Sequence, residues 1–379
     1  MVDNIRFSAP CLFGLEGPLA DEIKKIGATD VEASDGRVMF SGDMPILARA
    51  NLWLRTAERV GIVMGGFKAG SFDALYEGVR ALPWERFIGK NDTFPVSGWS
   101  LKSRLFSIPD CQSIIKKAVV DRLSSKYGIL RFEESGPVHA IKFSIMKDEA
   151  VLTIDTSGEG LHKRGYRQNS NDAPLKETLA AGMVALSRPY SDSTIYDPFC
   201  GSGTIAIEAA LALSNTAPGL KRSFAAEKWD VIDREIWKNE RVKALDMIDN
   251  NATFRVYASD IDEKCCELTR KNASYASVGS RISVERADIS DFALRSQRAV
   301  VITNPPYGER MLDIKRAREI YKTASEVFPA GYGLKYNIIS SDDEFERFFG
   351  RRADRKRKLY NGMLRCQLYM YFKGPSDGK

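Results

Sequence analysis

The sequence predicts an α/β protein, and three observations in its C-terminal half carry that prediction. The run 194–196 is β-branched and aromatic, and it leads through Asp197 into a glycine turn and an apolar helix. Acidic residues follow three successive predicted strands, at Asp197, Asp260 and Asp288. A fourth predicted strand, 299–303, leads into Asn-Pro-Pro-Tyr. Strands that alternate with helices in this way are typical of a parallel sheet, which binds ligands at its carboxyl edge.

Length and composition limit the number of domains, the cellular location and the kinds of site that the chain can have. The chain has 379 residues, enough for two or three domains, and its 44% hydrophobic and 28% charged content is typical of a soluble globular protein. It has no apolar run long enough for a membrane span and no signal-peptide core, so we expect a cytoplasmic protein. Six scattered cysteines and two histidines predict neither disulfides nor a metal site. The net charge of +6 permits a nucleic-acid partner without demonstrating one.

The N-terminal half is predicted to form two small α/β units. The first has a strand, a helix, a hairpin turning at Asp35-Gly36 and a second helix, over 5–13, 15–26, 31–40 and 46–54. The second has strands and helices over 59–67, 71–82, 93–101, 110–123, 138–145 and 150–155. The first unit carries no obvious catalytic chemistry.

Two basic stretches are candidates for nucleic-acid contact. Lys116 and Lys117 lie on one side of the predicted helix after Asp110. In the polar segment 157–172, three cations flank Tyr166, a pattern suited to phosphate contact plus base stacking; they are Lys163, Arg164 and Arg167. The alternatives are a solvated helix face for the first stretch and an interdomain linker for the second.

The glycine turn at Gly201 and Gly203 predicts a ligand lying against bare backbone at a helix N-terminus. No lysine of the phosphate-loop type is present, and Ala206 leaves the dinucleotide spacing open. Asp197 argues against a phosphate and favours a ligand that carries a cation or an amine. S-adenosylmethionine carries both a sulfonium and an ammonium. The alternative is an ordinary turn that binds nothing.

The Asn-Pro-Pro-Tyr segment predicts recognition of an exocyclic amine. Such an amine can donate to the Asn304 side chain and to the Pro305 carbonyl while its base stacks on Tyr307. Pro305 and Pro306 fix the backbone of the turn. The alternative is a rigid turn without chemistry.

The last part of the chain is predicted to contain a helix over 312–328, a strand over 336–340 and a short helix over 344–349. A basic run, 351–358, then precedes a terminal hairpin that turns at Asn361-Gly362. A long insertion, 213–251, separates the glycine turn from the next strand, and the last six residues are predicted to be disordered.

These motifs resemble those of a known family. D-P-F-C-G-S-G-T at 197–204 and T-N-P-P-Y-G-E-R at 303–310 resemble class I S-adenosylmethionine-dependent methyltransferases that act on exocyclic amines. H-K-R-G-Y-R at 162–167, A-P-L-K-E at 173–177 and A-P-G-L-K-R-S-F at 217–224 resemble the THUMP-domain RNA guanine-N2 methyltransferases. The nearest members are the bacterial 23S rRNA enzymes, which are often named N6-adenine-specific DNA methylases.

The resemblance implies three domains. A ferredoxin-like domain would occupy residues 1–55 and an RNA-binding THUMP domain residues 56–157, both α+β. A Rossmann-like methyltransferase domain would occupy residues 158–379, with a seven-stranded sheet whose last strand is antiparallel.

The same resemblance implies residue roles. Asp197, Gly201 and Gly203 would surround the methionine part of S-adenosylmethionine, while Asp260 would hold the ribose and Asp288 the adenine amine. The rest of the implied cofactor-binding set is Phe199, Cys200, Thr204, Ile261 and Ile289. The residues implied to position the target guanine are Asn304, Pro305, Pro306 and Tyr307, and those implied to bind RNA are Lys116, Lys117, Lys163, Arg164 and Arg167.

The implied reaction is direct methyl transfer to the N2 amine of a flipped guanine, most simply in 23S rRNA, without a covalent enzyme intermediate or a metal. Other functions stay open at this point. They are guanine-N2 methylation of tRNA, adenine-N6 methylation of RNA or DNA, and a non-catalytic role in RNA binding and assembly.

Overall fold

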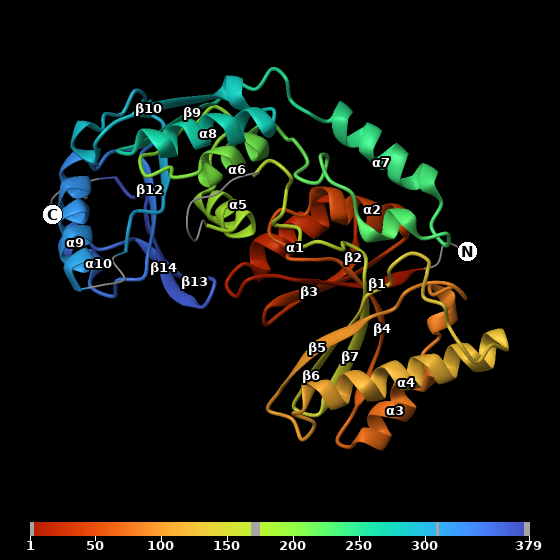
Figure 1. Ribbon diagram of the computed structural model, residues 1–379. Coiled ribbons are helices and arrows are strands. Elements are labelled where there is room, and N and C mark those ends of the chain that lie inside the picture. The colour runs from red at the N-terminus through yellow and green to blue at the C-terminus, as the bar shows by residue number, and fades with distance from the viewer. Residues whose placement is uncertain (1–3, 168–174, 308–310, 375–379) are drawn as a thin grey trace.

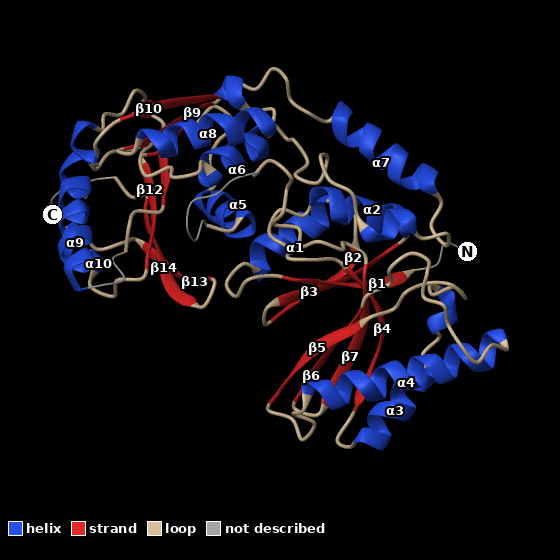
Figure 2. Cartoon of the chain, viewed as in Figure 1, coloured by secondary structure: helices blue, strands red, loops and turns tan. Residues whose placement is uncertain are grey.

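The computed structural model describes residues 4–167, 175–307 and 311–374 (Figure 1). Its strands form two seven-stranded sheets, and helices pack on both, so the predicted α/β class is confirmed. Figure 2 shows the two sheets in separate parts of the molecule. Some predicted features lie outside the described residues: the end of the polar segment, Ala173-Pro174, 308–310 and most of the tail.

The first sheet joins the two N-terminal units into one layer. Its order is β2-β3-β1-β4-β7-β6-β5, and the pairing of β1 with β4, where Phe7 lies opposite Ile62, crosses the predicted boundary at residues 55/56. Phe7 and Ile62 are both fully buried, as expected of neighbouring residues on one face of a sheet. The strands are β1 (Ile5–Pro10), β2 (Thr29–Ser34), β3 (Arg37–Gly42), β4 (Gly61–Lys68), β5 (Val96–Leu101), β6 (Ile141–Met146) and β7 (Glu149–Asp155).

Four α-helices belong to this part of the chain. They are α1 (Glu16–Lys25), α2 (Met44–Trp53), α3 (Phe72–Ala81) and α4 (Ile108–Tyr127), with a 3-10 turn at Trp84–Arg86. The predicted cap of α3 is present, since the Ser71 hydroxyl accepts a hydrogen bond from the Ala74 N–H at 3.2 Å. In Figure 1, α1 and α2 lie on the side nearest the C-terminal domain, and α3 and α4 lie away from it.

The second sheet carries the C-terminal domain. Its order is β10-β9-β8-β11-β12-β14-β13, and β14 runs antiparallel to both of its neighbours. The predicted seven-stranded sheet with an antiparallel last strand is therefore confirmed. The strands are β8 (Thr194–Asp197), β9 (Arg255–Asp260), β10 (Ile282–Arg286), β11 (Ala299–Thr303), β12 (Lys335–Ser340), β13 (Arg355–Asn361) and β14 (Leu364–Tyr371).

The terminal hairpin turns at Asn361-Gly362, as predicted, but its first strand is longer than predicted. Arg355 to Lys358, which the sequence placed in a basic run before the hairpin, pair with β14 as part of β13. This strand lies at the edge of the sheet, where exposed lysines and arginines are well tolerated because they discourage pairing with another chain.

The helices of the C-terminal domain are α5 (Glu177–Ser187), α6 (Thr204–Leu213), α7 (Arg234–Asp246), α8 (Glu263–Tyr275), α9 (Met311–Val327) and α10 (Phe345–Phe349). Short 3-10 turns lie at Ala225–Lys228, Gly279–Arg281 and Ile289–Asp291. The long insertion contributes α7, which packs against α2 of the first unit (Figure 1). Arg49 of α2 donates two hydrogen bonds, of 2.8 and 3.1 Å, to the Glu240 carboxylate of α7. The insertion therefore fastens the N-terminal unit to the C-terminal domain.

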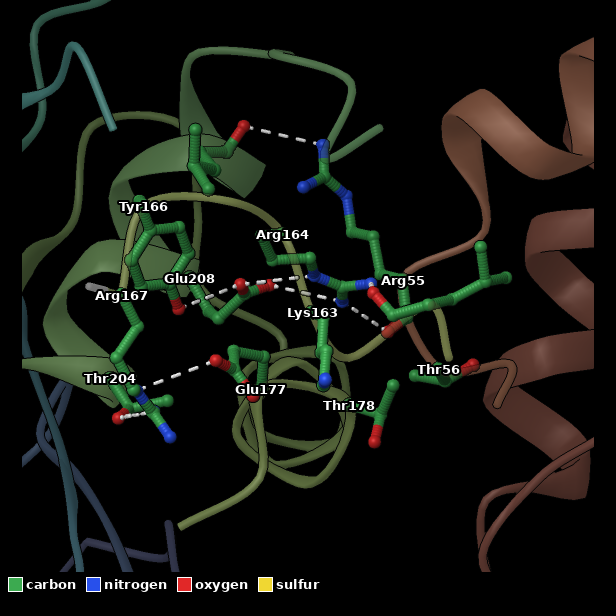
Figure 3. A network of polar contacts seen from close by, with 12 residues as sticks. Arg55, Thr56, Lys163, Arg164, Tyr166, Arg167, Glu177, Thr178, Thr204 and Glu208 are labelled. Carbon is green, nitrogen blue, oxygen red and sulfur yellow. Dashed lines mark hydrogen bonds and ion pairs between the residues drawn. The ribbon is translucent and has the colours of Figure 1, made fainter. Parts of the chain in front are cut away.

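A buried polar network joins the linker to both parts (Figure 3). The Arg164 guanidinium pairs with the Glu208 carboxylate of α6 at 3.3 Å and donates to the Arg55 carbonyl, while the Tyr166 hydroxyl donates to Glu208 at 3.1 Å. Arg164 is 3% exposed and Tyr166 is 2% exposed. The predicted phosphate contact by Arg164 and base stacking by Tyr166 are wrong, because both side chains hold domains together and neither reaches the surface.

Removal of the Glu208 carboxylate is expected to be strongly destabilising. Glu208→Ala leaves the Arg164 charge buried without its partner, which typically costs about 3–5 kcal/mol. Urea unfolding of the variant and the wild type measures the loss. The control is Glu235→Ala, which removes an exposed pair with Lys238 and should change the free energy of unfolding by less than ~1 kcal/mol. Equal unfolding midpoints for Glu208→Ala and the control would contradict this account.

Candidate functional site

Three acidic residues meet at one edge of the second sheet. Asp197 and Asp260 are the last residues of β8 and β9, and Asp288 follows β10 by two positions. These strands are parallel neighbours, so their carboxyl ends lie side by side. The structure thus brings together the acidic residues that the sequence singled out.

The glycine turn between β8 and α6 is fixed by its neighbours. Gly201 and Gly203 have φ values of +52° and +83°, which side chains disfavour. A Cβ at Gly203 would lie 2.7 Å from the Thr269 side chain of α8, whereas a Cβ at Gly201 would meet nothing within 4 Å. The Gly201 N–H donates to the Asp260 carboxylate at 2.9 Å. Gly203 is therefore required for packing, and Gly201 borders open space.

Asp197 is a buried carboxyl with a free oxygen. It is 1% exposed, and its Oδ1 accepts a hydrogen bond from the Thr303 hydroxyl at 2.9 Å. Its Oδ2 is also buried and has no hydrogen-bond partner among the residues that the structure describes. Burial raises the pKa of the carboxyl to about 7. A buried carboxylate without a counter-charge fits a ligand that carries an ammonium group.

The other two acidic residues are held in place by the backbone. The Asp260 carboxylate accepts hydrogen bonds from the N–H groups of Gly201 and Asp262, at 2.9 and 3.0 Å. Asp288 accepts from the Ser290 N–H and hydroxyl, which lower the pKa of its carboxyl. Beside them, Ile261 is 59% exposed and Ile289 is 8% exposed. Of these two predicted cofactor contacts, Ile261 has the accessible apolar surface.

Several residues predicted to bind the cofactor are buried or half-buried in and around the glycine turn. Cys200 and Thr204 are buried, and Phe199 is half-buried. The Cys200 N–H donates to the Ser259 carbonyl at 2.9 Å, and burial raises the pKa of the thiol well above its usual range. A neutral, buried thiol does not serve as a nucleophile. The environment of Cys200 is therefore unfavourable for a covalent intermediate at its thiol.

The Asn-Pro-Pro-Tyr segment leaves β11 at the same edge. The Tyr307 hydroxyl donates to the Asn304 Oδ1 and also interacts with Asn361 and Cys366 of the terminal hairpin. Burial raises the pKa of Tyr307 well above its usual range, so its hydroxyl stays protonated and remains a donor. The sequence missed this bond; it had assigned Tyr307 only a stacking face.

The two proline carbonyls differ in their partners. The Pro306 carbonyl accepts a hydrogen bond from the Tyr321 hydroxyl of α9 at 3.1 Å. No hydrogen bond from a described residue reaches the Pro305 carbonyl, which leaves that acceptor for a ligand. Sequence reasoning missed Tyr321 and Thr303, although Thr303 directly precedes the motif. The only signals were a tyrosine within a predicted helix and a threonine at a strand end.

The remaining residues predicted to bind RNA differ in their accessibility. The Arg167 side chain is 14% exposed, lies 3.4 Å from Glu177 and donates to the Leu175 carbonyl and the Thr204 hydroxyl. This corrects its prediction as a free phosphate contact, since its donors link α5 to α6. Lys116 pairs with Glu134 at 2.5 Å, whereas Lys117 and Lys163 are exposed.

No helix in the described ranges is both long and apolar enough to cross a membrane. Within the same ranges, no three His, Cys, Asp or Glu residues are grouped so that they could hold a metal ion.

Comparison with protein families identifies the C-terminal domain. A model described as the RMKL-like methyltransferase domain matches residues 164–370, which include the whole carboxyl edge. The chain belongs to the RMKL-like methyltransferase family. Models of the RlmL ferredoxin-like domain and of the THUMP domain match residues 6–61 and 69–155. The resemblance to THUMP-domain methyltransferases that the sequence suggested is therefore confirmed.

Individual relatives agree with the family. The chain is similar to "Putative RNA methyltransferase YpsC" of Bacillus subtilis, with 40% identity covering 95% of this chain and 94% of the relative. It is also 34% identical to "Ribosomal RNA large subunit methyltransferase K/L" of Shewanella baltica, over 97% of this chain but 53% of the relative. The chain thus spans about half the length of the K/L proteins that it matches.

A solved structure identifies the cofactor of this methyltransferase. SMU.472, titled "a putative methyltransferase complexed with SAH", superposes with a TM-score of 0.93 at 37% identity and full coverage of both chains. S-adenosylhomocysteine is what S-adenosylmethionine becomes after losing its methyl group. S-adenosylmethionine is therefore the cofactor of this family member, and the free Asp197 oxygen suits its ammonium group.

The cofactor affinity is expected to depend on pH through Asp197. The folded-state pKa of about 7 lies above the ordinary value of 3.8, so the carboxylate that attracts an ammonium group forms only as the pH rises through 7. S-adenosylhomocysteine should bind about tenfold more weakly at pH 6 than at pH 8. Calorimetry in two buffers of different ionisation enthalpy measures both the affinity and the proton released.

Two variants control this experiment. Asp197→Asn should bind more weakly at pH 8 and lose the pH dependence, because the amide does not ionise. Asp288→Asn should keep the pH dependence between pH 6 and pH 8, since hydrogen bonds to Ser290 lower the pKa of that carboxyl. A wild-type affinity that is constant between pH 6 and pH 8 would refute the assignment.

Proposed function

We propose that this methyltransferase transfers a methyl group to the exocyclic N2 amine of a guanine in large-subunit (23S) ribosomal RNA. The observation that carries the proposal is the Asn304–Tyr307 turn, whose acceptors stand at the same sheet edge as the free Asp197 carboxyl oxygen. The RNA substrate is supported by the THUMP model match and by the names of YpsC and of the K/L proteins.

The cofactor residues have distinct proposed roles. Asp197 would pair with the ammonium group of the cofactor, and the open space at Gly201 would take its methionine part. Asp260 would accept hydrogen bonds from the ribose hydroxyls, and Asp288 one from the adenine amine. When bound, S-adenosylmethionine supplies an electrophilic methyl group on its sulfonium.

Asn304 and Pro305 would orient the amine of the target base. The Asn304 Oδ1 has two lone pairs, and the Tyr307 hydroxyl uses one, which leaves the second for an amine N–H. The Pro305 carbonyl can accept the other N–H. With both N–H groups held, the nitrogen lone pair is directed out of the plane of the base, toward the methyl group. The Asn304 amide does not take up a proton, so the proton leaves the amine for water after transfer. Proximity and orientation then provide much of the rate.

The proposal is tested by methyl transfer to defined nucleic acids. Purified protein receives S-adenosylmethionine with a labelled methyl group and, separately, unmodified ribosomal RNA, tRNA or duplex DNA. Mass spectrometry of the digested products identifies the labelled nucleoside. Label in N2-methylguanosine from ribosomal RNA alone is the expected result. Label in N6-methyladenine would show that the proposed target base is wrong. Label in tRNA would show that the proposed RNA substrate is wrong. No label in any pool would contradict the proposed catalytic role.

Substitution of Asn304 should remove catalysis and spare cofactor binding. Asn304→Ala deletes the side-chain acceptor, and we expect kcat to fall by about a hundredfold or more, the range seen when one positioned polar group is lost. Tyr307→Phe, which removes only the hydroxyl that orients Asn304, should cost about tenfold. Single-turnover methylation gives the rates, and S-adenosylhomocysteine binding gives the cofactor affinity.

The matched control is Tyr332→Phe, at a tyrosine that is 76% exposed. It should leave both the rate and the affinity unchanged. A wild-type rate for Asn304→Ala would exclude Asn304 from catalysis.

A further inference from the structure

A second cavity of about 720 Å³ lies where the linker meets the C-terminal domain. It is within the size range of ordinary ligand sites and is separate from the carboxyl edge. Its walls come from the segment after β7, from the linker, from the start of α5 and from the insertion. The lining includes the cations Lys163, Arg164, Arg167, Lys221, Arg222 and Lys228. We refer to it as the junction cavity.

The junction cavity is strongly cationic. Six lysine and arginine side chains line it, against two carboxylates, in a chain whose net charge is only +6. One of the carboxylates, Glu177, already faces Arg167 at 3.4 Å. Such a concentration of one charge in a concave site attracts ligands of opposite charge.

Arg222 shows that the positive charge is not neutralised within the protein. Its guanidinium donates only to main-chain carbonyls, including those of Gly160 and Glu159 at 2.6 Å, and pairs with no carboxylate of a described residue. Burial and the nearby Arg164 lower the pKa of Arg222 to about 10. Cations held close together in this way are stabilised when an anion enters between them.

Three lysines around the cavity can turn toward such an anion. Lys228 is exposed and makes no hydrogen bond or ion pair with another described residue. Lys163 is directed away from the Arg164–Glu208 pair (Figure 3). Among the described residues it forms an ion pair only with Glu159, at 3.1 Å, and this pair is exposed and therefore weak. Lys221 donates to the Ser277 hydroxyl and the Tyr275 carbonyl and keeps a third N–H.

The position of the cavity decides which anion it suits. It begins where β7 ends, at Ser157–Glu159, and reaches Arg167 and Glu177, the first of which contacts the start of α6 through Thr204. The THUMP match ends at residue 155, just before the lining begins, so a ligand in the cavity would lie beside that part of the chain and against the domain that holds the glycine turn. Because its cations come from both the linker and the insertion, an extended chain of phosphates can contact more of them than a single phosphate ion can.

We propose that the junction cavity binds the sugar-phosphate backbone of the RNA substrate, with Lys163, Lys221 and Lys228 contacting phosphates. The inference rests on the proposed function, because it requires an RNA substrate. It assigns the contact to three lysines, two of them in the insertion, and replaces the contacts that the sequence predicted at Arg164 and Arg167. Those two arginines are largely buried walls of the cavity, and each already faces a carboxylate, Glu208 for Arg164 and Glu177 for Arg167.

The test is a charge-reversal pair, Lys163→Glu/Lys228→Glu, with Lys25→Glu/Lys271→Glu as a control that has the same net charge. The probe is a fluorescein-labelled fragment of unmodified large-subunit ribosomal RNA, titrated with full-length protein at several salt concentrations. We expect the cavity variant to bind at least tenfold more weakly at about 0.1 M salt. The slope of log affinity against log salt should fall by about one for each phosphate that the variant no longer neutralises.

Each outcome has one meaning. An unchanged affinity and salt slope in the cavity variant, while the wild type binds and methylates the fragment, would overturn the junction cavity and leave the proposed function intact. Failure of the wild type to bind or methylate any RNA would instead overturn the proposed function, on which this inference rests. A further arm titrates inorganic phosphate and ATP. If these bind through the same lysines while RNA affinity does not change, the assignment to RNA is wrong.

Two measurements separate binding from folding. The cavity variant should keep the wild-type S-adenosylhomocysteine affinity and urea midpoint, because exposed lysines contribute little to stability. Lys163→Gln/Lys228→Gln, which removes charge without reversing it, should give a smaller reduction of RNA affinity in the same direction. A fall in cofactor affinity in parallel with RNA affinity would contradict a site that is separate from the carboxyl edge.

Discussion

The buried Arg164–Glu208 pair is the contact on which the arrangement of this molecule depends. Glu208 is fully buried in α6, the helix that begins at the glycine turn, and Arg164 belongs to the linker that leaves the first sheet. Removing one member of a buried ion pair is costly, because the remaining charge then has neither its partner nor water around it. Through the Arg55 carbonyl, the same guanidinium reaches the N-terminal unit. The position of the first sheet and the position of the glycine turn are therefore coupled through one guanidinium group.

The second sheet brings the groups of the carboxyl edge together. Asp197, Asp260 and Asn304 are far apart in the chain, yet each stands at the carboxyl end of a neighbouring parallel strand. A hydrogen bond from the Gly201 N–H to Asp260 and one from the Thr303 hydroxyl to Asp197 then tie these strand ends to one another. Hydrogen bonds therefore connect the groups at this edge. Among the described residues, the Oδ2 of Asp197 is the buried carboxylate oxygen of the edge that has no hydrogen-bond partner.

Much of this edge could be predicted from the sequence because its determinants are local. A strand, its terminal acidic residue and the turn that follows lie within a few residues of one another, and parallel pairing then brings the strand ends together. The fate of Arg164 could not be predicted in this way. Its partner Glu208 lies 44 residues further along the chain, and nothing in the pattern around Arg164 distinguishes an exposed phosphate ligand from a buried ion pair. The Tyr307 bond was missed for a different reason: its partner, Asn304, is only three residues away, but the bond depends on how the turn folds back.

Charge divides the surface that a nucleic acid would meet. The carboxyl edge carries Asp197, Asp260 and Asp288, and carboxylates repel phosphates, so a phosphate backbone gains nothing by lying directly against it. The junction cavity, whose lining includes none of these residues, carries the opposite charge. A polyanion would therefore be held at the cavity, and a base with a neutral amine could extend to the acidic edge without bringing its phosphate along. On this view the acidic residues that suit the cationic cofactor also keep the backbone of the proposed RNA substrate away from it. The proposed cofactor recognition and the proposed extrusion of the target base would then depend on the same charges.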